Sequence, residues 1–218
     1  RGTLGCRVVN ITFSEREIRD FAVAWLALGV AFAIFFTGGG LRGVASIVGA
    51  GFVGPLLVSL LTAGVGFLLH ELGHKVAAVR FDQIAEFRAD YGMLFLAVMS
   101  ALVGFLFAAP GAVHHRGMLT EREHGLIALA GPAVNLLLVV VFVPLLVGGL
   151  LFSSPLVTEI GEKGLAVNLF LAAFNLVPYG PLDGRTVLSW SKLVWATTFL
   201  PSAAVAIYVV FVLGIGFS

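Results

Sequence analysis

Long apolar runs separated by short polar segments make up most of the chain. Several of these runs hold twenty or more residues without a charge, which is the length that a helix needs to cross the hydrocarbon core of a bilayer. The pattern predicts an all-α polytopic membrane protein with about six transmembrane helices, surrounded by membrane lipid. The expected spans lie within residues 21–36, 44–69, 93–109, 125–152, 165–177 and 193–217.

Capping patterns indicate where two of these helices begin. Ser14 and Glu17 stand three residues apart just before the first run, and Thr120 and Glu123 do so before the fourth. In such a capping box the hydroxyl accepts from the amide three residues on, while the glutamate reaches back to the cap. We therefore expect a helix from about Glu15, ended by the glycines at 38–40, and a second capped helix after residue 120.

Two segments depart from a simple row of helices. Pro55 lies inside the second run, so a broken or re-entrant entry fits this segment as well as one straight span. Between residues 81 and 90, apolar and charged residues alternate with period two. This alternation predicts a short β segment associated with the membrane.

Composition and charge support one membrane domain over residues 1–218, with a motif-bearing core at 56–190. Apolar residues make up 59% of the chain and charged residues 11%, which excludes an ordinary soluble globule. A net charge of +1 offers no excess for binding nucleic acid. The single cysteine, Cys6, excludes an intrachain disulfide and a cysteine metal cluster, and we interpret it as an incidental small residue. Lysines and arginines are more numerous on the side of the N-terminus, which favours a cytoplasmic N-terminus.

The residues His70, Glu71 and His74 form an H-E-x-x-H pattern at the end of the second run. Residues four apart lie on one face of a helix, so both imidazoles can bind one metal while the glutamate lies beside the remaining coordination position. The alternative is a helix end whose polar residues only reach the membrane interface. Ionisable residues next to a long apolar run favour the functional interpretation.

A hydrolytic zinc site takes three protein ligands, so a third must come from elsewhere in the chain. Asp183 is the candidate, because it lies in an apolar context where an unpaired carboxylate is costly to bury. His114, His115 and His124 are interpreted as interfacial residues rather than ligands. The remaining acidic candidates fall in polar loops, where solvation explains them: Asp82, Glu86, Asp90, Glu121, Glu123, Glu159 and Glu162.

Three motifs together resemble the site-2 protease family of intramembrane zinc metalloproteases. They are the H-E-x-x-H at 70–74, a G-P-x-x-N element at 131–135 and an N-x-x-P-x-x-P-L-D-G stretch at 175–184. The resemblance implies one Zn²⁺ per chain and a transmembrane protein as substrate. The roles it implies are metal ligation by His70, His74 and Asp183, general-base catalysis by Glu71, substrate or oxyanion contact by Asn175, and shaping of the core by Gly131, Pro132 and Asn135.

Several alternatives stay open at this point. A metal transporter or a scaffold without activity could carry the same residues, although transport gives no reason for a glutamate directly after the first histidine. Asn175 could instead cap the end of the fifth span. The segment Ala85 to Asp90 could present a strand edge to an unwound substrate, or it could be an ordinary surface hairpin. Glycines near the motif suit close helix packing better than a polar channel: Gly64, Gly66 and Gly73.

Overall fold

The computed structural model describes residues 11–49, 51–107 and 110–216, so Cys6 lies outside the described residues. Helices account for most of this part of the chain, with two short strands and two π-helical turns, η1 and η2. In chain order the elements are α1 (Glu15–Phe36), α2 (Gly40–Val48), α3 (Val53–Ser59), η1 (Leu60–Gly64), α4 (Val65–Arg80), β1 (Ile84–Ala89), α5 (Tyr91–Val103), β2 (Gly111–Arg116), α6 (Glu121–Leu151), α7 (Pro155–Asn175), α8 (Asp183–Trp190), α9 (Lys192–Ile207) and η2 (Tyr208–Val212).

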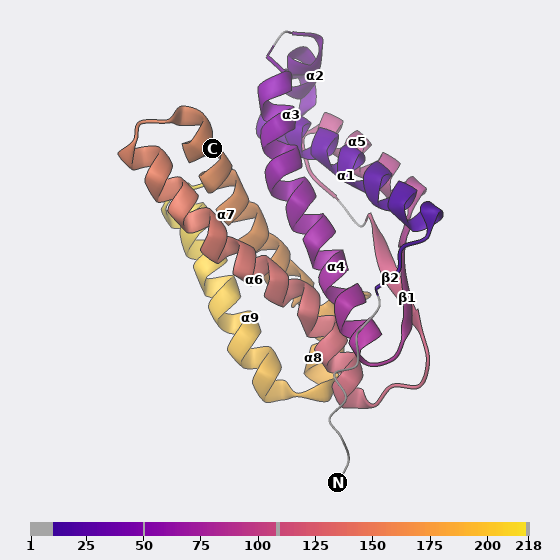
Figure 1. Cartoon of the computed structure of the whole chain (residues 1–218). Helices are drawn as coiled ribbons and strands as arrows, with labels where there is room; N and C mark the ends of the chain where they lie inside the picture. Colours follow the sequence, from indigo (N-terminus) through magenta and orange to yellow (C-terminus); the bar gives the residue numbers. More distant parts are fainter. Residues whose placement is uncertain (1–10, 50, 108–109, 217–218) are drawn as a thin grey trace.

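The helices form two groups that meet where α4 packs against α6 (Figure 1). The first group holds α1 to α5 together with the two strands, which pack against α4. The second group holds α6 to α9, with α7 packed against α6 and α9. Short α8 lies near the same end of α4 and α6, so three parts of the chain converge there.

Within the described residues, four helices are long and apolar enough to cross a membrane: Glu15–Phe36, Val53–Arg80, Glu121–Leu151 and Lys192–Val212. The expected number of six is therefore not confirmed. The third run forms α5, which has 13 residues and is about 20 Å long, shorter than a hydrocarbon core of ~30 Å. The fifth run is the second half of α7, whose first half carries Glu159, Glu162 and Lys163.

The second span is one long helix interrupted by a π-helical turn. Pro55 is the third residue of α3, where a missing N–H costs no helical hydrogen bond. A separate short helix, α2, precedes it, so the entry is broken before residue 53 and continuous after it. At the π turn the carbonyl oxygen of Leu60 accepts from the Val65 amide and also from the indole nitrogen of Trp25 at 3.0 Å, which ties α1 to this turn.

Both capping serine and threonine take the expected positions, but Glu17 does not. Ser14 caps α1 by accepting from the Glu17 amide at 3.1 Å, and Thr120 forms a full capping box with Glu123. The Glu17 carboxylate, by contrast, points into the protein and is fully buried. The Glu17 side chain therefore contacts distant parts of the chain rather than its own helix end, and the spacing of a capping box could not indicate this.

Strands β1 and β2 pair in antiparallel fashion, with Phe87 opposite Val113. The alternation at 81–90 predicted β1, whereas its partner β2 was not expected. The Phe87 amide donates to Glu17 Oε1 at 2.9 Å, so the outer edge of β1 faces α1. The expectation that Ala85 to Asp90 present a free edge is therefore wrong at Phe87, because an acidic side chain already takes the amide.

The three glycines around the motif serve close packing, as expected. A Cβ atom at each position would lie too near a side chain of another helix for any real contact. The blocking atoms would be Trp25 Cδ1 at 2.6 Å from a Cβ on Gly64, Asn168 Oδ1 at 2.7 Å from one on Gly66, and Val134 Cγ2 at 2.9 Å from one on Gly73.

A buried ion pair fastens α4 to α1 beside the metal motif. Lys75 Nζ lies 2.5 Å from Glu17 Oε2, and the two side chains are 1% and 0% exposed. The ammonium group also donates to the carbonyl of Thr12 at 2.7 Å and lies 4.0 Å from the ring centre of Phe13. With Phe87 on the other carboxylate oxygen, Glu17 joins α1, α4 and β1 in one network.

Lys75→Met should therefore destabilise the protein, because the Glu17 carboxylate would stay buried without its cation. We expect the free energy of unfolding in detergent to fall by about 3–5 kcal/mol. Denaturant unfolding followed by circular dichroism measures this, with Arg80→Met on the exposed end of α4 as control. Adding Glu17→Gln should restore part of the loss; an equal or larger loss in the double variant would contradict the assignment to an unpaired charge.

Candidate metal centre

Helix α4 brings His70 and His74 to one buried face, one turn apart. Their Nε2 atoms lie 3.0 Å from each other, and the residues are 5% and 8% exposed. Each ring is held through its other nitrogen: Nδ1 of His70 lies 2.6 Å from Asn135 Oδ1, and Nδ1 of His74 lies 2.8 Å from the carbonyl oxygen of Ile127. Both Nε2 atoms are therefore directed at the same point.

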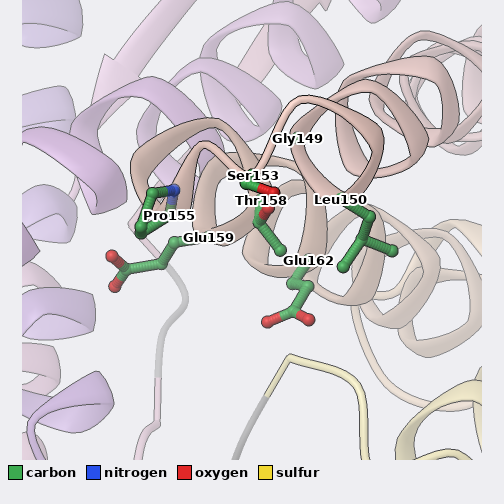
Figure 2. A pocket seen from close by; sticks show the side chains of 7 residues that line it. All are labelled: Gly149, Leu150, Ser153, Pro155, Thr158, Glu159 and Glu162. Atoms are coloured by element: carbon green, nitrogen blue, oxygen red, sulfur yellow. The ribbon is translucent and has the colours of Figure 1, made fainter.

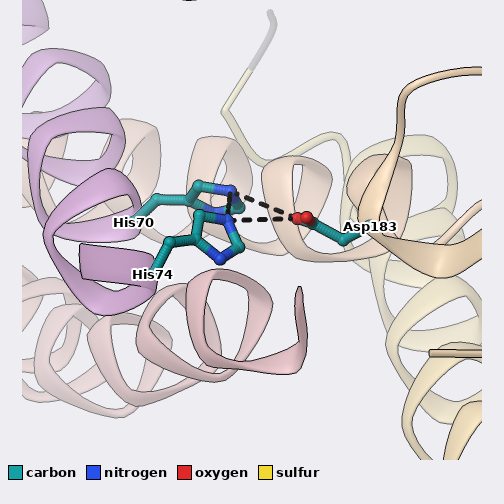
Figure 3. A group of neighbouring side chains, drawn as sticks. All are labelled: His70, His74 and Asp183. Atoms are coloured by element: carbon teal, nitrogen blue, oxygen red, sulfur yellow. Dashed lines mark hydrogen bonds and ion pairs between the residues drawn. The ribbon is translucent and has the colours of Figure 1, made fainter. Parts of the chain in front are cut away.

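Asp183 reaches that point from the far end of the sequence. It is the first residue of α8, and its Oδ2 atom lies 3.4 Å from His70 Nε2 and 3.3 Å from His74 Nε2 (Figure 3). The turn before α8 is fastened by Trp195, whose indole nitrogen donates to the Leu176 carbonyl at 2.8 Å. The predicted three-residue set is thus brought together, and it forms a group that could hold a metal ion.

The spacing of the three atoms suits zinc. Ligands ~2.0–2.2 Å from a tetrahedral zinc ion lie about 3.3–3.6 Å apart, close to the separations of the three atoms here. Space for an ion is also kept open, because a Cβ atom on Gly131 would lie 2.6 Å from His70 Nε2 and even nearer to His74. Two neutral imidazoles and a carboxylate are ordinary zinc ligands, so the chemistry of the donor set agrees with the spacing of its atoms.

Glu71 lies beside this cluster and has a free carboxylate oxygen. The residue is 7% exposed, and its Oε2 atom is buried without a hydrogen-bond partner among the described residues. The backbone amide of Val113, on β2, faces the same carboxylate. A buried carboxylate with an unused acceptor is costly unless a ligand or water completes it, which fits a group that accepts a proton next to a metal.

The other histidines do not join the cluster, as expected. The rings of His115 and His124 stack edge to face at 5.4 Å, while His114 is exposed on the other face of β2. Burial lowers the pKa of His115, and the neighbouring His124, His74 and His114 lower it further. A metal-binding group of three or more residues occurs among the described residues only at His70, His74 and Asp183.

The structure places Asn175 at the end of α7, where its amide nitrogen donates to the Leu171 carbonyl at 2.9 Å. This bond lies within its own helix, so the role of Asn175 toward a substrate stays a prediction. Asn135 was assigned to shaping the core, yet it contacts a metal-binding histidine directly. The G-P-x-x-N spacing was the available signal, because it sets Gly131 and Asn135 four residues apart on one face of α6.

A depression at the opposite end of α6 is not part of this centre. Figure 2 shows its two carboxylates, Glu159 and Glu162, near the junction of α6 and α7. Gly149, which also lines the depression, lies about 27 Å along the helix from Gly131 at 1.5 Å per residue. These acidic side chains are therefore too far away to serve as ligands in the cluster.

Asp183→Ala should sharply weaken zinc binding, because it removes one of three ligands. The loss of affinity should exceed the ~10–100-fold typical of losing a side chain that only supports a ligand. Purified protein titrated with zinc against a competing chelator measures the affinity, with Glu162→Ala as a matched acidic control. Full zinc stoichiometry and affinity in Asp183→Ala would exclude this residue as the third ligand.

Comparison with known proteins agrees with this centre. A relative from Methanocaldococcus jannaschii is 38% identical over 202 residues, covering 91% of this chain and 97% of the relative. A relative from Bacillus subtilis is 31% identical over 62% of this chain and 68% of its own length, and one from Synechocystis is 33% identical over 66% of this chain but only 34% of its own length. All three bear names that begin "Putative zinc metalloprotease".

Neither a protein-family model nor a solved structure matches the chain. The names of these relatives nevertheless specify zinc, which is the metal that the cluster suits, and a hydrolytic activity rather than transport. Because the similarity to the Methanocaldococcus jannaschii relative extends over nearly the whole of both chains, the protein belongs to this family of zinc metalloproteases.

Proposed function

We propose that the protein is an intramembrane zinc metalloprotease of the site-2 type, which hydrolyses a peptide bond in or near a transmembrane segment of a protein substrate. The observation that carries this proposal is the position of the metal cluster on a helix of membrane-spanning length. His70 lies ten residues before the end of the span Val53–Arg80, hence about 15 Å along its axis from that end. A site at this depth can meet peptide bonds that are buried in a bilayer.

Glu71 is the general base in this proposal. Its unpaired Oε2 lies in a buried site next to both histidines, where it can take a proton from water and pass it to the leaving amine. Zinc, when bound, acidifies water and polarises the carbonyl of the scissile bond. The imidazoles and Asp183 would hold the metal, and the backbone amide of Val113 faces the Glu71 carboxylate.

Asn175 is proposed to contact the substrate backbone. Its amide nitrogen is used by Leu171, which leaves the carbonyl oxygen as an acceptor for a peptide N–H. It ends α7 just before the turn that leads to Asp183, on the same segment that approaches the metal.

Glu71→Gln should abolish proteolysis and leave zinc bound, because glutamine keeps the shape of the side chain but cannot accept the proton of water. We expect cleavage of a single-span model substrate in liposomes to fall by about 10²–10⁴-fold. Zinc content measured on the same preparation should stay near one per chain. Cleavage near the wild-type rate would exclude Glu71 as the base.

An unwound substrate segment would pair with the outer edge of β2 rather than with β1. A transmembrane helix must lose its internal hydrogen bonds before attack, and each unsatisfied group in lipid costs several kcal/mol. Since Phe87 points its amide away from β2, the antiparallel pattern directs the amides of Gly111, Val113 and His115 away from β1. The Val113 amide faces Glu71 and is not free for a substrate, so the amides of Gly111 and His115 are the ones proposed to pair with it beside the metal centre.

His115→Pro removes one outward amide of β2 and should slow cleavage of the model substrate several-fold. Ala85→Pro is the matched control, because Ala85 lies directly opposite His115 and its amide faces the other edge of the sheet. Cleavage per folded, zinc-loaded molecule is the quantity compared. His115→Ala separates loss of the ring from loss of the amide. Equal effects of the two prolines would show that the β2 edge does not bind substrate.

A further inference from the structure

A chain of buried hydrogen bonds leads from His70 through two asparagines to α7. Asn135 Oδ1 lies 2.6 Å from His70 Nδ1, and Asn135 Nδ2 donates to Asn168 Oδ1 at 2.9 Å. Asn168 Nδ2 donates to the Gly164 carbonyl at 2.8 Å, and Asn135 Nδ2 also donates to the Gly66 carbonyl at 3.2 Å. Both asparagine side chains are fully buried, so no bulk water competes for these bonds.

The two backbone carbonyls at the ends of the chain decide the direction of every bond in it. A carbonyl oxygen only accepts, so Asn168 must turn its NH₂ group toward Gly164 and its oxygen toward Asn135. That oxygen and the Gly66 carbonyl both need a donor, so Asn135 turns its NH₂ group toward them. The oxygen of Asn135 is then left facing His70, whose Nδ1 atom must carry the hydrogen.

A neutral imidazole carries only one N–H, so this arrangement leaves Nε2 of His70 with its lone pair. Nε2 is the atom that faces His74 and Asp183. His74 reaches the same state more simply, since its Nδ1 can only donate to the Ile127 carbonyl. For His70 the acceptor is a side-chain amide that could rotate, and a rotated Asn135 would select the other tautomer.

We propose that Asn135 and Asn168 are positioning residues that hold His70 in its metal-binding tautomer, with Asn168 preventing rotation of the Asn135 amide. This inference rests on the zinc site at His70, His74 and Asp183. Gly66 makes the arrangement possible, because a Cβ atom there would lie 2.7 Å from Asn168 Oδ1. Asn168 lies outside the three sequence motifs, and its function is seen only through its partner.

The first test reads the tautomer directly in metal-free protein. With ¹⁵N-labelled histidine, long-range ¹H–¹⁵N spectra in detergent distinguish a protonated Nδ1 from a protonated Nε2, and a His70→Gln sample assigns the signal. Wild-type protein above the titration range of histidine should show His70 protonated at Nδ1. A wild-type His70 protonated at Nε2 would overturn the proposal without any asparagine variant.

The second test measures zinc affinity by competition with a chelator. Asn135→Leu should lower the affinity about 10–100-fold and Asn168→Leu about tenfold, the range seen when a partner of a metal ligand is lost. Both variants should shift metal-free His70 toward the Nε2-protonated form. Asn168→Asp should recover much of the affinity, because a protonated carboxyl group can accept from Asn135 and donate to Gly164.

Val167→Ala is the matched control, because this neighbour on α7 is fully buried but makes no bond in the chain of amides. It should lower thermal stability and leave zinc affinity per folded molecule unchanged. The positioning role would be refuted if the wild-type protein binds zinc and both leucine variants keep its zinc affinity and its His70 tautomer. That result would leave the protease proposal intact. Failure of wild-type protein to bind zinc would refute the protease proposal instead, and the metal-free spectra would still decide the tautomer.

Discussion

Charged groups inside an apolar bundle must each find a partner. Helix α4 has two such contacts, which start from neighbouring residues of the helix and lead to different parts of the chain. His70 and His74 face the Asp183 carboxylate across the position where a metal cation would balance its charge, whereas Lys75 pairs with Glu17 from the N-terminal part of the chain. An unpaired charge in this environment costs several kcal/mol, so neither contact can be given up without consequence. The two helix groups are therefore joined through adjacent residues of a single helix, and the metal centre lies at that junction.

The same constraint positions the sheet. Glu17 uses one carboxylate oxygen for Lys75 and the other for the Phe87 amide, so the charge that neutralises α4 also fixes β1 against α1. Because β1 pairs with β2 in a fixed register, the outer amides of β2 then face the metal side. Glu71 lies one turn before Lys75 on the same face of α4, so the sheet that Glu17 holds there also brings the Val113 amide beside Glu71.

One element of α6 serves the metal centre in two ways. Gly131 leaves the space that a side chain would take from the imidazoles, and Asn135, one turn later, bonds to His70. The missing side chain at Gly131 and the side-chain amide of Asn135 therefore both act on His70. Through Asn168, this effect extends to α7, which otherwise contributes packing to the bundle.

The sequence by itself determined the features that depend on near neighbours in the chain. Capping residues and helical spacing predicted the start of α1 and the shared face of the two histidines, and apolar context indicated Asp183 as their partner. Only the tertiary structure decided the role of Glu17, the existence of β2 and the bonding of Asn168. Each of these depends on a group more than 20 residues away, and no local period or spacing records such a distance. The number of spans is also a feature that only the tertiary structure decides. Hydropathy measures the length of an apolar run, but it does not show whether a short apolar helix such as α5 packs against α1 or crosses the membrane.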